Sequence, residues 1–252
     1  MLKRLFGQKE RYAPPEALQP DKLPAHLALI MDGNGRWAKA RNLPRLAGHQ
    51  RGGETLKAII RYCSDIGIRY LTVYAFSTEN WSRPKDEVDG LMELLVRFLQ
   101  AEVDELHANR VRMKVLGDLS RLPKAGQAEF GKALEKTAGN DGLTLCIALN
   151  YGSRDEILMG VRALAEAAAR GELTPEEITE EQFGQALYTA GIPDPDLLIR
   201  TSGELRISNF LLWQIAYSEL WFTETPWPDF TPQELEKALI AYQDRDRRYG
   251  KL

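Results

Sequence analysis

Short apolar runs alternate along the chain with longer stretches of helical periodicity, and this alternation limits the folds open to it. Strand-like runs occupy residues 27–31, 69–76, 111–116, 143–149, 196–201 and 219–223. Apolar residues recur at helical spacing over about 51–67, 86–109, 121–138 and 153–170, and typical helix starts occur at 174–177 and 231–234. Strands that alternate with helices predict a single α/β domain with a mainly parallel, six-stranded sheet and helices on both faces.

The composition fits one globular domain. A chain of 252 residues with 44% hydrophobic and 27% charged residues is long enough for one large core. Its net charge of −3 argues against nucleic acid as a partner. Cys63 and Cys146 have neither metal-ligand nor CxxC spacing, so we interpret them as free thiols in a reducing compartment, which favours the cytoplasm.

The first residues differ from the rest of the chain. They contain no apolar segment of the signal-peptide kind, and no run in the chain approaches the ~20 apolar residues that span a bilayer. We expect residues 1–22 to form a flexible extension, in which Leu2, Leu5 and Phe6 could touch a membrane surface. Residues 23–252 are expected to form the domain itself.

A carboxylate and a glycine turn follow the first predicted strand. Asp32 comes directly after the run 27–31, at the edge where open α/β sheets bind ligands. Gly33 and Gly35 let the backbone bend and point N–H groups at an anion. Because a carboxylate repels a phosphate beside it, the pairing predicts a Mg²⁺ ion between the two. The alternative is that Asp32 caps a helix and the glycines form an ordinary turn.

The same glycines also fit a dinucleotide-binding pattern. Gly33, Gly35 and Ala38 match G-x-G-x-x-G/A between a strand and a helix. The acidic residue nearest the expected spacing, Glu54, falls in a predicted helix instead of at a strand end. Asp32 also places negative charge where the pyrophosphate would lie. Dinucleotide binding is therefore the weaker hypothesis.

Arginines and serines lie near several predicted strand ends. Parallel strands deliver their carboxyl ends to one edge of a sheet, so this edge should collect Asp32, residues 77–83, Asp118, Asn150 and Arg200. Guanidinium groups and hydroxyls suit phosphates, and the candidates are Arg36, Arg45, Arg83, Arg200, Arg206, Ser77, Ser202 and Ser208. A single arginine is more often a solvated surface residue. The sequence contains no Walker A, protein kinase or G-x-S-x-G pattern.

The predicted helix over 86–109 has an apolar surface wider than packing on a sheet requires. A neighbouring helix or a second subunit could cover the excess. Alternatively, the helix lines a cavity for a long hydrocarbon.

Several segments together resemble the cis-prenyltransferases, the family of the bacterial undecaprenyl diphosphate synthases. They are MDGNGRWA at 31–38, GH at 48–49, FSTENWSRP at 76–84, NYG at 150–152 and DLLIRTSGELRISNF at 196–210. The resemblance covers about residues 24–250, and its motifs occur in the family's order. The aspartate-rich DDxxD motif of trans-prenyl synthases is absent from the sequence.

The resemblance implies Mg²⁺-dependent condensation of isopentenyl diphosphate onto an allylic diphosphate such as farnesyl diphosphate, with each new double bond in cis geometry. The product would be a long-chain polyprenyl diphosphate, namely undecaprenyl diphosphate for the cell-wall lipid carrier. It would grow in a hydrophobic tunnel that opens at the carboxyl edge of the sheet. The family also implies a cytoplasmic homodimer that touches the membrane surface transiently and binds no nucleic acid. Alternatives are a shorter- or medium-chain synthase and a non-catalytic subunit that binds isoprenoid diphosphates.

Matching motif positions carry the family's residue roles over to this chain. Asp32 would hold Mg²⁺ and help the allylic diphosphate leave, with Glu219 as a second metal-contacting carboxylate. His49 would contact a phosphate or assist proton movement. The resemblance assigns the allylic diphosphate to Gly33, Asn34, Gly35, Arg36 and Arg45, and the isopentenyl diphosphate to Arg200, Arg206, Ile207 and Ser208. The residues expected to complete the substrate walls are Trp37, Ser77, Thr78, Glu79, Trp81 and Arg83.

Further positions concern the proton, the product length and the partner. The family gives Asn80 a role in removing the isopentenyl proton, but a neutral amide is a poor base. We therefore expect Asn80 to orient the substrate while a diphosphate oxygen accepts the proton. Leu143 matches a position at the far end of the tunnel, where side-chain bulk limits product length. Residues 248–250 resemble an element that reaches the partner's active site, or form a frayed helix end. Ser153 departs from a family glycine.

Overall fold

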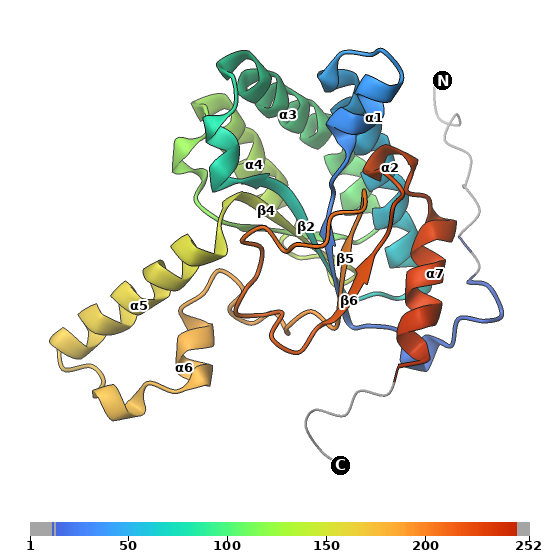
Figure 1. The fold of residues 1–252 in the computed structure, drawn as a ribbon. Helices are drawn as coiled ribbons and strands as arrows, with labels where there is room; N and C mark the ends of the chain where they lie inside the picture. Colours follow the sequence, from blue (N-terminus) through green and yellow to red (C-terminus); the bar gives the residue numbers. More distant parts are fainter. Residues whose placement is uncertain (1–11, 13, 246–252) are drawn as a thin grey trace, which may run out of the picture.

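One sheet of six strands lies at the centre of the protein, whose computed structural model describes residues 12 and 14–245 (Figure 1). All neighbouring strands are parallel, in the order β3-β4-β2-β1-β5-β6. The strands are β1 (His26–Ile30), β2 (Tyr70–Ser77), β3 (Arg112–Leu116), β4 (Thr144–Tyr151), β5 (Leu197–Arg200) and β6 (Glu219–Phe222). The predicted α/β class and six-stranded parallel sheet are confirmed.

Strand β1 is the point at which the strand order changes direction. It pairs with β2 on one side and with β5 on the other, and Ile30 stands opposite Arg200 in the register. In open α/β sheets, ligands bind outside the carboxyl ends of the strands at such a switch point. The fold therefore brings Asp32, directly after β1, beside the end of β5.

Helices cover one face of the sheet. The described residues contain α1 (Asn34–Ala40), α2 (Arg45–Ile66), α3 (Lys85–Ala108), α4 (Lys124–Thr137), α5 (Ser153–Ala169), α6 (Glu180–Gln185) and α7 (Pro232–Gln243). Side chains from α2, α3, α4 and α7 form the main core with strand residues such as Leu29, Val73 and Ile147. This core buries the large apolar side chains on that face.

The other face carries smaller strand side chains, among them Ala28, Cys146 and Ala148. Its core is completed mainly by residues from the irregular segments on either side of β5, such as Ile192 and Phe210. Small side chains allow a chain without regular helix to lie close to the sheet. Helices α5 and α6 pack on each other as an arm that projects from the body (Figure 1).

Helix α2 begins at Arg45, before the predicted start near residue 51. Gly48 and Gly52 obscure the pattern because glycine has low helix propensity. They are needed where α1 approaches: a Cβ added to Gly48 would lie 2.1 Å from the Asn34 carbonyl oxygen. A Cβ on Gly52 would lie 2.4 Å from Asn34 Oδ1. Glycine thus brings α1 and α2 together at the carboxyl edge.

The two predicted helix starts differ in outcome. Thr231 caps α7 by accepting a hydrogen bond from the Glu234 N–H. The capping box at Thr174 opens only a 3-10 turn, because the backbone is extended at Ile178. Helix α6 then starts after a cap of its own, Thr179.

Part of the predicted N-terminal extension has fixed contacts. Leu18 is 4% exposed in the main core, and the Gln19 N–H donates to Gln243 Oε1 at 2.7 Å. The Tyr12 ring packs edge-on against Tyr62. The membrane contact expected of Leu2, Leu5 and Phe6, and the tail 248–250, lie outside the described residues. No helix among residues 12 and 14–245 is long and apolar enough to span a membrane.

Candidate active site

An ion pair joins the two strands at the switch point. Arg200 Nη2 donates to Asp32 Oδ2 at 2.9 Å, and the Arg200 side chain is 4% exposed. The Gly33 N–H donates to Asp32 Oδ1 at 2.6 Å, and Thr201 Oγ1 donates to the Asp32 carbonyl oxygen at 2.7 Å. The Asp32 carboxylate is therefore held in place, with 29% of its side chain still exposed.

Asp32 is ionised in this setting. Burial works to raise the pKa of its carboxyl group, but the hydrogen bond from Arg200 and the positive charges of Arg200 and Arg36 outweigh it. The pKa of Asp32 is consequently lower than its usual value. A negative charge thus persists at the centre of a positively charged rim.

Further charged and hydroxyl groups gather around this pair. Arg36 Nη2 lies 3.4 Å from Asp32 Oδ2, while Arg36 Nη1 lies 3.1 Å from Glu204 Oε1. Arg206 pairs with the same Glu204. Arg200 Nη1 donates to Ser208 Oγ at 2.7 Å. The predicted proximity of Asp32 to the arginines of 196–210 is thus present.

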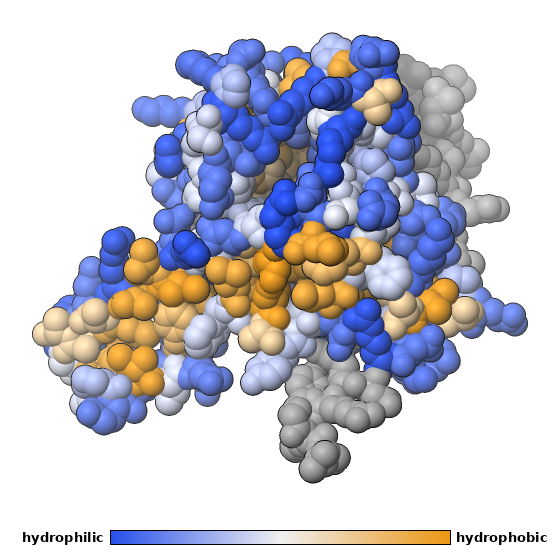
Figure 2. Space-filling model, viewed as in Figure 1, coloured by the Kyte–Doolittle hydropathy of each residue, from blue (hydrophilic) through white to orange (hydrophobic). Residues whose placement is uncertain are grey.

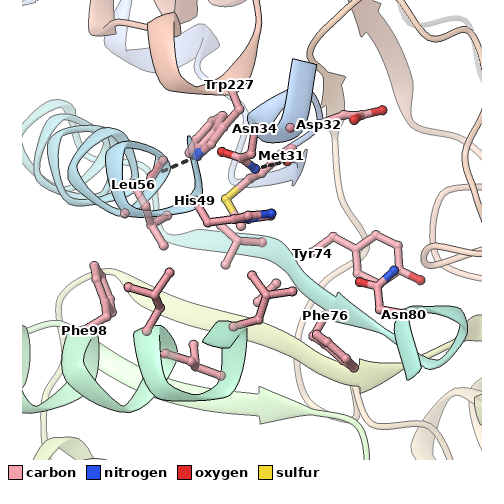
Figure 3. Close-up of a pocket in the computed structure, with 18 of the residues that line it drawn as sticks. Met31, Asp32, Asn34, His49, Leu56, Tyr74, Phe76, Asn80, Phe98 and Trp227 are labelled. Atoms are coloured by element: carbon pink, nitrogen blue, oxygen red, sulfur yellow. Dashed lines mark hydrogen bonds between the residues drawn. The ribbon is translucent and has the colours of Figure 1, made fainter. Parts of the chain in front are cut away.

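A cavity of about 230 Å³ opens on one side of Asp32. Its polar mouth contains Asp32, Gly33, Asn34, Gly35, Arg45, His49, Asn80 and Arg83. Further inside, its lining is apolar and comes from α2, β2, β4 and α3, with Leu56, Phe76 and Phe98 among the contributors (Figure 3). Helix α3 lines this cavity with Leu91, Leu95 and Phe98, and it also packs on α4, where Val96 lies beside Gly126. A neighbouring helix and a cavity therefore both account for the wide apolar surface over 86–109.

A second hollow lies on the other side of Asp32. It is lined by Tyr74, Ser77, Glu79, Arg200, Arg206 and Ser208, and by residues that it shares with the first cavity. The shared polar residues are Asp32, Tyr74, Asn80 and Arg83. Two hollows that contain arginine side chains thus meet at one wall, and only the first continues into apolar surroundings.

Two buried polar atoms in the first cavity have no hydrogen-bond partner among the described residues. They are Asn34 Oδ1 and His49 Nε2. Burial, together with the nearby charges of Arg83 and Arg45, lowers the pKa of His49 to about 4. The imidazole is therefore neutral at pH 7, and its free Nε2 faces the space where an anion would bind.

The sequence of the chain matches proteins of known family. The sequence profile described as "Putative undecaprenyl diphosphate synthase" matches residues 30–250. An isoprenyl transferase of Clostridium perfringens is 54% identical over 230 residues, 91% of each chain. The isoprenyl transferase of Heliobacterium mobile is 53% identical and covers 97% of this chain and 96% of its own length. The chain belongs to the undecaprenyl diphosphate synthase family of prenyltransferases.

Solved prenyltransferase structures share the fold. Lavandulyl diphosphate synthase from Lavandula x intermedia, in complex with dimethylallyl diphosphate, matches with a TM-score of 0.90 and 39% identity over 92% of this chain and all of its own. A probable undecaprenyl diphosphate synthase from Campylobacter jejuni matches with a TM-score of 0.76 and 36% identity, covering 90% of this chain and 99% of its own. The protein is therefore a prenyltransferase, as the sequence motifs predicted.

Some residues that were predicted to contact substrate instead make hydrogen bonds or core contacts outside the two hollows. Trp37 Nε1 donates to Asp229 Oδ1 at 2.7 Å, and Trp81 Nε1 donates to Asn150 Oδ1 at 2.7 Å. Thr78 Oγ1 donates to Asp155 at 3.1 Å, and Ile207 packs in the core of the opposite face. Neither hollow is lined by Trp37, Thr78 or Trp81, which were expected in the substrate walls, or by Ile207, which was expected at the isopentenyl diphosphate.

Glu219 lies far from Asp32 within one chain. It starts β6 and stands opposite Leu197, whereas Asp32 follows the carboxyl end of β1. At about 3.3 Å per strand residue, roughly 16 Å along the strand direction separates the positions of Glu219 and Asp32. Glu219 instead pairs with Arg245 at 2.5 Å. Leu143 also lies at the amino edge, where it lines a separate hollow.

The sequence reasoning missed two residues that position the rim. Glu87 Oε1 lies 3.0 Å from Arg83 Nη1 and 3.2 Å from Arg45 Nε, so it orients both arginines. Its spacing of four residues from Arg83 was the available signal. The second residue is Tyr74. Its hydroxyl donates to the Tyr151 carbonyl oxygen at 3.2 Å, and its ring stacks on Phe210 with 4.4 Å between the ring centres.

Proposed function

We propose that this prenyltransferase condenses isopentenyl diphosphate sequentially onto an allylic diphosphate such as farnesyl diphosphate, with Mg²⁺ and in cis geometry. The product is a long-chain polyprenyl diphosphate, with undecaprenyl diphosphate for a cell-wall lipid carrier as the expected case. One observation carries the proposal: two anion-binding hollows share the wall of Asp32, Asn80 and Arg83, and only one of them opens into an apolar cavity.

The two hollows suit two different diphosphates. An allylic diphosphate would place its headgroup at Arg45, Arg83 and the backbone of Gly33 to Gly35, with its hydrocarbon in the cavity. Isopentenyl diphosphate would bind at Arg200, Arg206 and Ser208, where no long tail can follow. The lavender synthase complex with dimethylallyl diphosphate supports allylic diphosphate binding by this fold.

Mg²⁺ fits the shared wall. It commonly binds one or two carboxylates together with substrate phosphates. Asp32 offers an ionised carboxylate, and the cavity also holds the unpartnered Asn34 Oδ1. Residues 12 and 14–245 contain no cluster of three potential metal-binding side chains, so substrate oxygens would have to complete the coordination. When bound, the ion supplies Lewis-acid stabilisation to the departing diphosphate.

The protein's own groups would then orient the reaction. The Asn80 side-chain oxygen accepts a hydrogen bond from the Ser77 N–H at 3.2 Å, which fixes the amide at the shared wall. An amide held in this way can orient isopentenyl diphosphate, and a diphosphate oxygen accepts the proton lost from it. The apolar cavity excludes water from the allylic chain.

The test measures incorporation of radiolabelled isopentenyl diphosphate into farnesyl diphosphate, with Mg²⁺ or with excess EDTA. The products are dephosphorylated and sized by thin-layer chromatography. The proposal expects a series of long products in Mg²⁺ and none in EDTA. A short terminal product would indicate a shorter-chain synthase. Binding of farnesyl diphosphate without any incorporation would instead support a non-catalytic subunit.

An apolar band on the surface supports a homodimer. Figure 2 shows it running from the α5–α6 arm toward the segment before β6. Leu158 and Val161 on α5, and Leu205, Trp213 and Tyr217 before β6, are all exposed. Monomeric proteins rarely expose large contiguous apolar patches, and a second copy would bury this one. Sedimentation velocity should give a dimer that Leu158→Glu weakens; a monomeric wild type would contradict the proposal.

We further propose that the dimer is cytoplasmic and contacts the membrane surface only to release product. The apolar product and the missing spanning helix among residues 12 and 14–245 fit this location. Cell fractionation should recover the protein mainly in the cytosol, with a fraction on membranes that rises during turnover. Recovery in membranes alone would contradict the proposal.

A further inference from the structure

The second hollow depends on a turn that a backbone does not adopt easily. In residues 208–212, the Ser208 turn, the φ angles of Ser208, Asn209 and Leu211 are positive, at 53°, 60° and 47°. Residues other than glycine rarely adopt such angles, and the conformation persists only where surrounding contacts hold it. Ser208 and Asn209 both line the second hollow, so the shape of this hollow depends on those contacts.

The start of helix α5 supplies three of the contacts. The Ser153 N–H donates to the Asn209 carbonyl oxygen at 2.8 Å, and the Arg154 N–H donates to Asn209 Oδ1 at 2.9 Å. The Leu212 N–H donates to Ser153 Oγ at 2.9 Å. The first two contacts use main-chain N–H groups that have no partner inside the helix, and almost any residue would provide them. Only the third contact requires a hydroxyl group at position 153.

Position 153 is also where the chain departs from the glycine of the family that it resembles. The Ser153 side chain is fully buried. Gly152 before it lies so close to the turn that an added Cβ would be 2.8 Å from Asn209 Nδ2. A glycine at position 153 would keep the two main-chain contacts and remove the hydroxyl. This chain therefore has an attachment of the Ser208 turn that the family's glycine would not supply.

Ser208 connects the turn to the arginine of the second hollow. Its Oγ accepts a hydrogen bond from Arg200 Nη1 at 2.7 Å, and its carbonyl oxygen accepts one from the Tyr74 hydroxyl at 3.4 Å. A turn that moved away from α5 would carry Ser208 with it. The hydroxyl that faces isopentenyl diphosphate would then lose its fixed position.

We propose that the Ser153 hydroxyl positions Ser208 for isopentenyl diphosphate by holding the Ser208 turn against α5. The inference deepens the proposed function and rests on it. Ser153 lines neither hollow, so its hydroxyl acts through the turn and does not touch substrate. The residues proposed for the allylic headgroup belong to other elements, so the hydroxyl affects only one of the two substrates.

The expected effect is a change in the KM of that substrate. A single hydrogen bond corresponds to about a two- to tenfold change in an equilibrium constant. Ser153→Ala should raise the KM for isopentenyl diphosphate by about that factor. The KM for farnesyl diphosphate and kcat should stay within about twofold, because the hydroxyl contacts neither the allylic substrate nor the reacting atoms.

The experiment measures initial rates of the wild type, Ser153→Ala, Ser208→Ala, the double variant and Thr137→Ala, with each substrate varied in turn. Thr137 is the matched control: its buried hydroxyl also accepts a main-chain N–H, that of Met113 at 3.1 Å, but it lines neither hollow. Thermal melting identifies variants that do not fold, and Ser153→Gly replaces Ser153→Ala if the latter is one of them. Because Ser153 acts through Ser208, the double variant should raise the KM for isopentenyl diphosphate by less than the product of the two single effects.

The outcomes separate this inference from the proposed function. A wild type that incorporates no isopentenyl diphosphate overturns the proposed function and the inference with it. A wild type that condenses the two substrates, with an unchanged KM for isopentenyl diphosphate in Ser153→Ala, overturns the inference alone. Equal rises in the KM of both substrates, or the same rise in Thr137→Ala, also overturn it, since general loosening of the fold would then be the cause. A double variant that shows the full product of the single effects overturns it as well. A rise confined to isopentenyl diphosphate, with a smaller combined effect in the double variant, supports it.

Discussion

At the amino edge of the sheet, both ring nitrogens of His26 have partners, whereas at the carboxyl edge Nε2 of His49 has none among the described residues. His26 Nδ1 lies 2.6 Å from the Pro193 carbonyl oxygen, and its Nε2 lies 2.7 Å from Thr72 Oγ1. Burial lowers the pKa of both histidines to about 4. His26 is fully buried and joins strands to a loop, whereas His49 is only partly buried and its Nε2 keeps no partner among the described residues.

The two edges also differ in their Asp–Arg pairs. Arg110 and Asp141 at the amino edge form a bidentate pair with 69% and 60% of their side chains exposed. Arg200 and Asp32 at the carboxyl edge form a pair with 4% and 29% exposed. Exposed ion pairs contribute little to the free energy of folding. A shielded pair holds its charges in a fixed place, where they interact strongly with nearby groups. The carboxyl edge thus holds a fixed and shielded charge pair, whereas the pair at the amino edge is solvated.

The largest expected effect is the difference in kcat/KM between variants of Asp32 and of Asp141. Asp32→Asn should lower kcat/KM by about a thousandfold, because losing one charged group that stabilises a transition state costs roughly 10²- to 10³-fold or more. Asp141→Asn, the matched change in the exposed pair, should stay within about twofold. Both are measured as incorporation of labelled isopentenyl diphosphate at saturating Mg²⁺. Similar losses in the two variants would remove the distinction between the edges.

The convergence at the carboxyl edge was predictable because it depends on topology. Parallel strands that end in Asp32 and Arg200 must present them on one side, whichever loops follow. The orientation of Arg45 was not predictable from spacing, since Glu87 reaches it from the first turn of α3. Local sequence does not report such contacts between elements.

Other features escaped sequence reasoning for different reasons. The segments that cover the second face have no period, because they form few regular elements and touch small strand side chains. The part of the cavity lined by Phe98 on α3 and Gly53 on α2 depends on a packing relation between two helices. A pattern along one helix shows that a residue is apolar, and it does not show which space the residue closes.

The second largest effect concerns His26 and the stability of the fold. Its folded pKa of about 4 lies below the usual value of 6.5, because burial disfavours the charged form. The stability contribution is therefore complete above pH 6.5 and is lost as the pH falls toward 4. The difference corresponds to about 2 kcal/mol between pH 7.5 and pH 5. Urea unfolding should show that the free energy of unfolding differs less between the two pH values in His26→Gln than in the wild type. An equal difference in the two proteins would contradict this.

A third, smaller effect compares two helical glycines. Gly52→Ala would bring a methyl group to 2.4 Å from Asn34 Oδ1 and 2.9 Å from Trp227 Cδ1, so α1 and α2 must separate at the cavity mouth. Overpacking of this kind costs about 1–3 kcal/mol. Gly131→Ala on α4 meets nothing within 4 Å and should stabilise by up to about 1 kcal/mol. Thermal melts of both variants test this, and the same sign of shift in both would contradict it.

The smallest expected effect tests the ligand role of His49 directly. A diphosphate beside its free Nε2 would raise the His49 pKa from about 4 toward 6, since an opposite charge commonly shifts a pKa by 1–3 units. Protonation is then linked to binding, so affinity for inorganic diphosphate should gain about twofold at pH 6 relative to pH 8. The same calorimetric titration of His49→Asn at the two pH values gives the pH dependence that comes from the diphosphate itself, which is then subtracted from that of the wild type. His26→Gln should keep the full gain, because its imidazole lies at the other edge; a gain that survives in His49→Asn would show that no proton is taken up there.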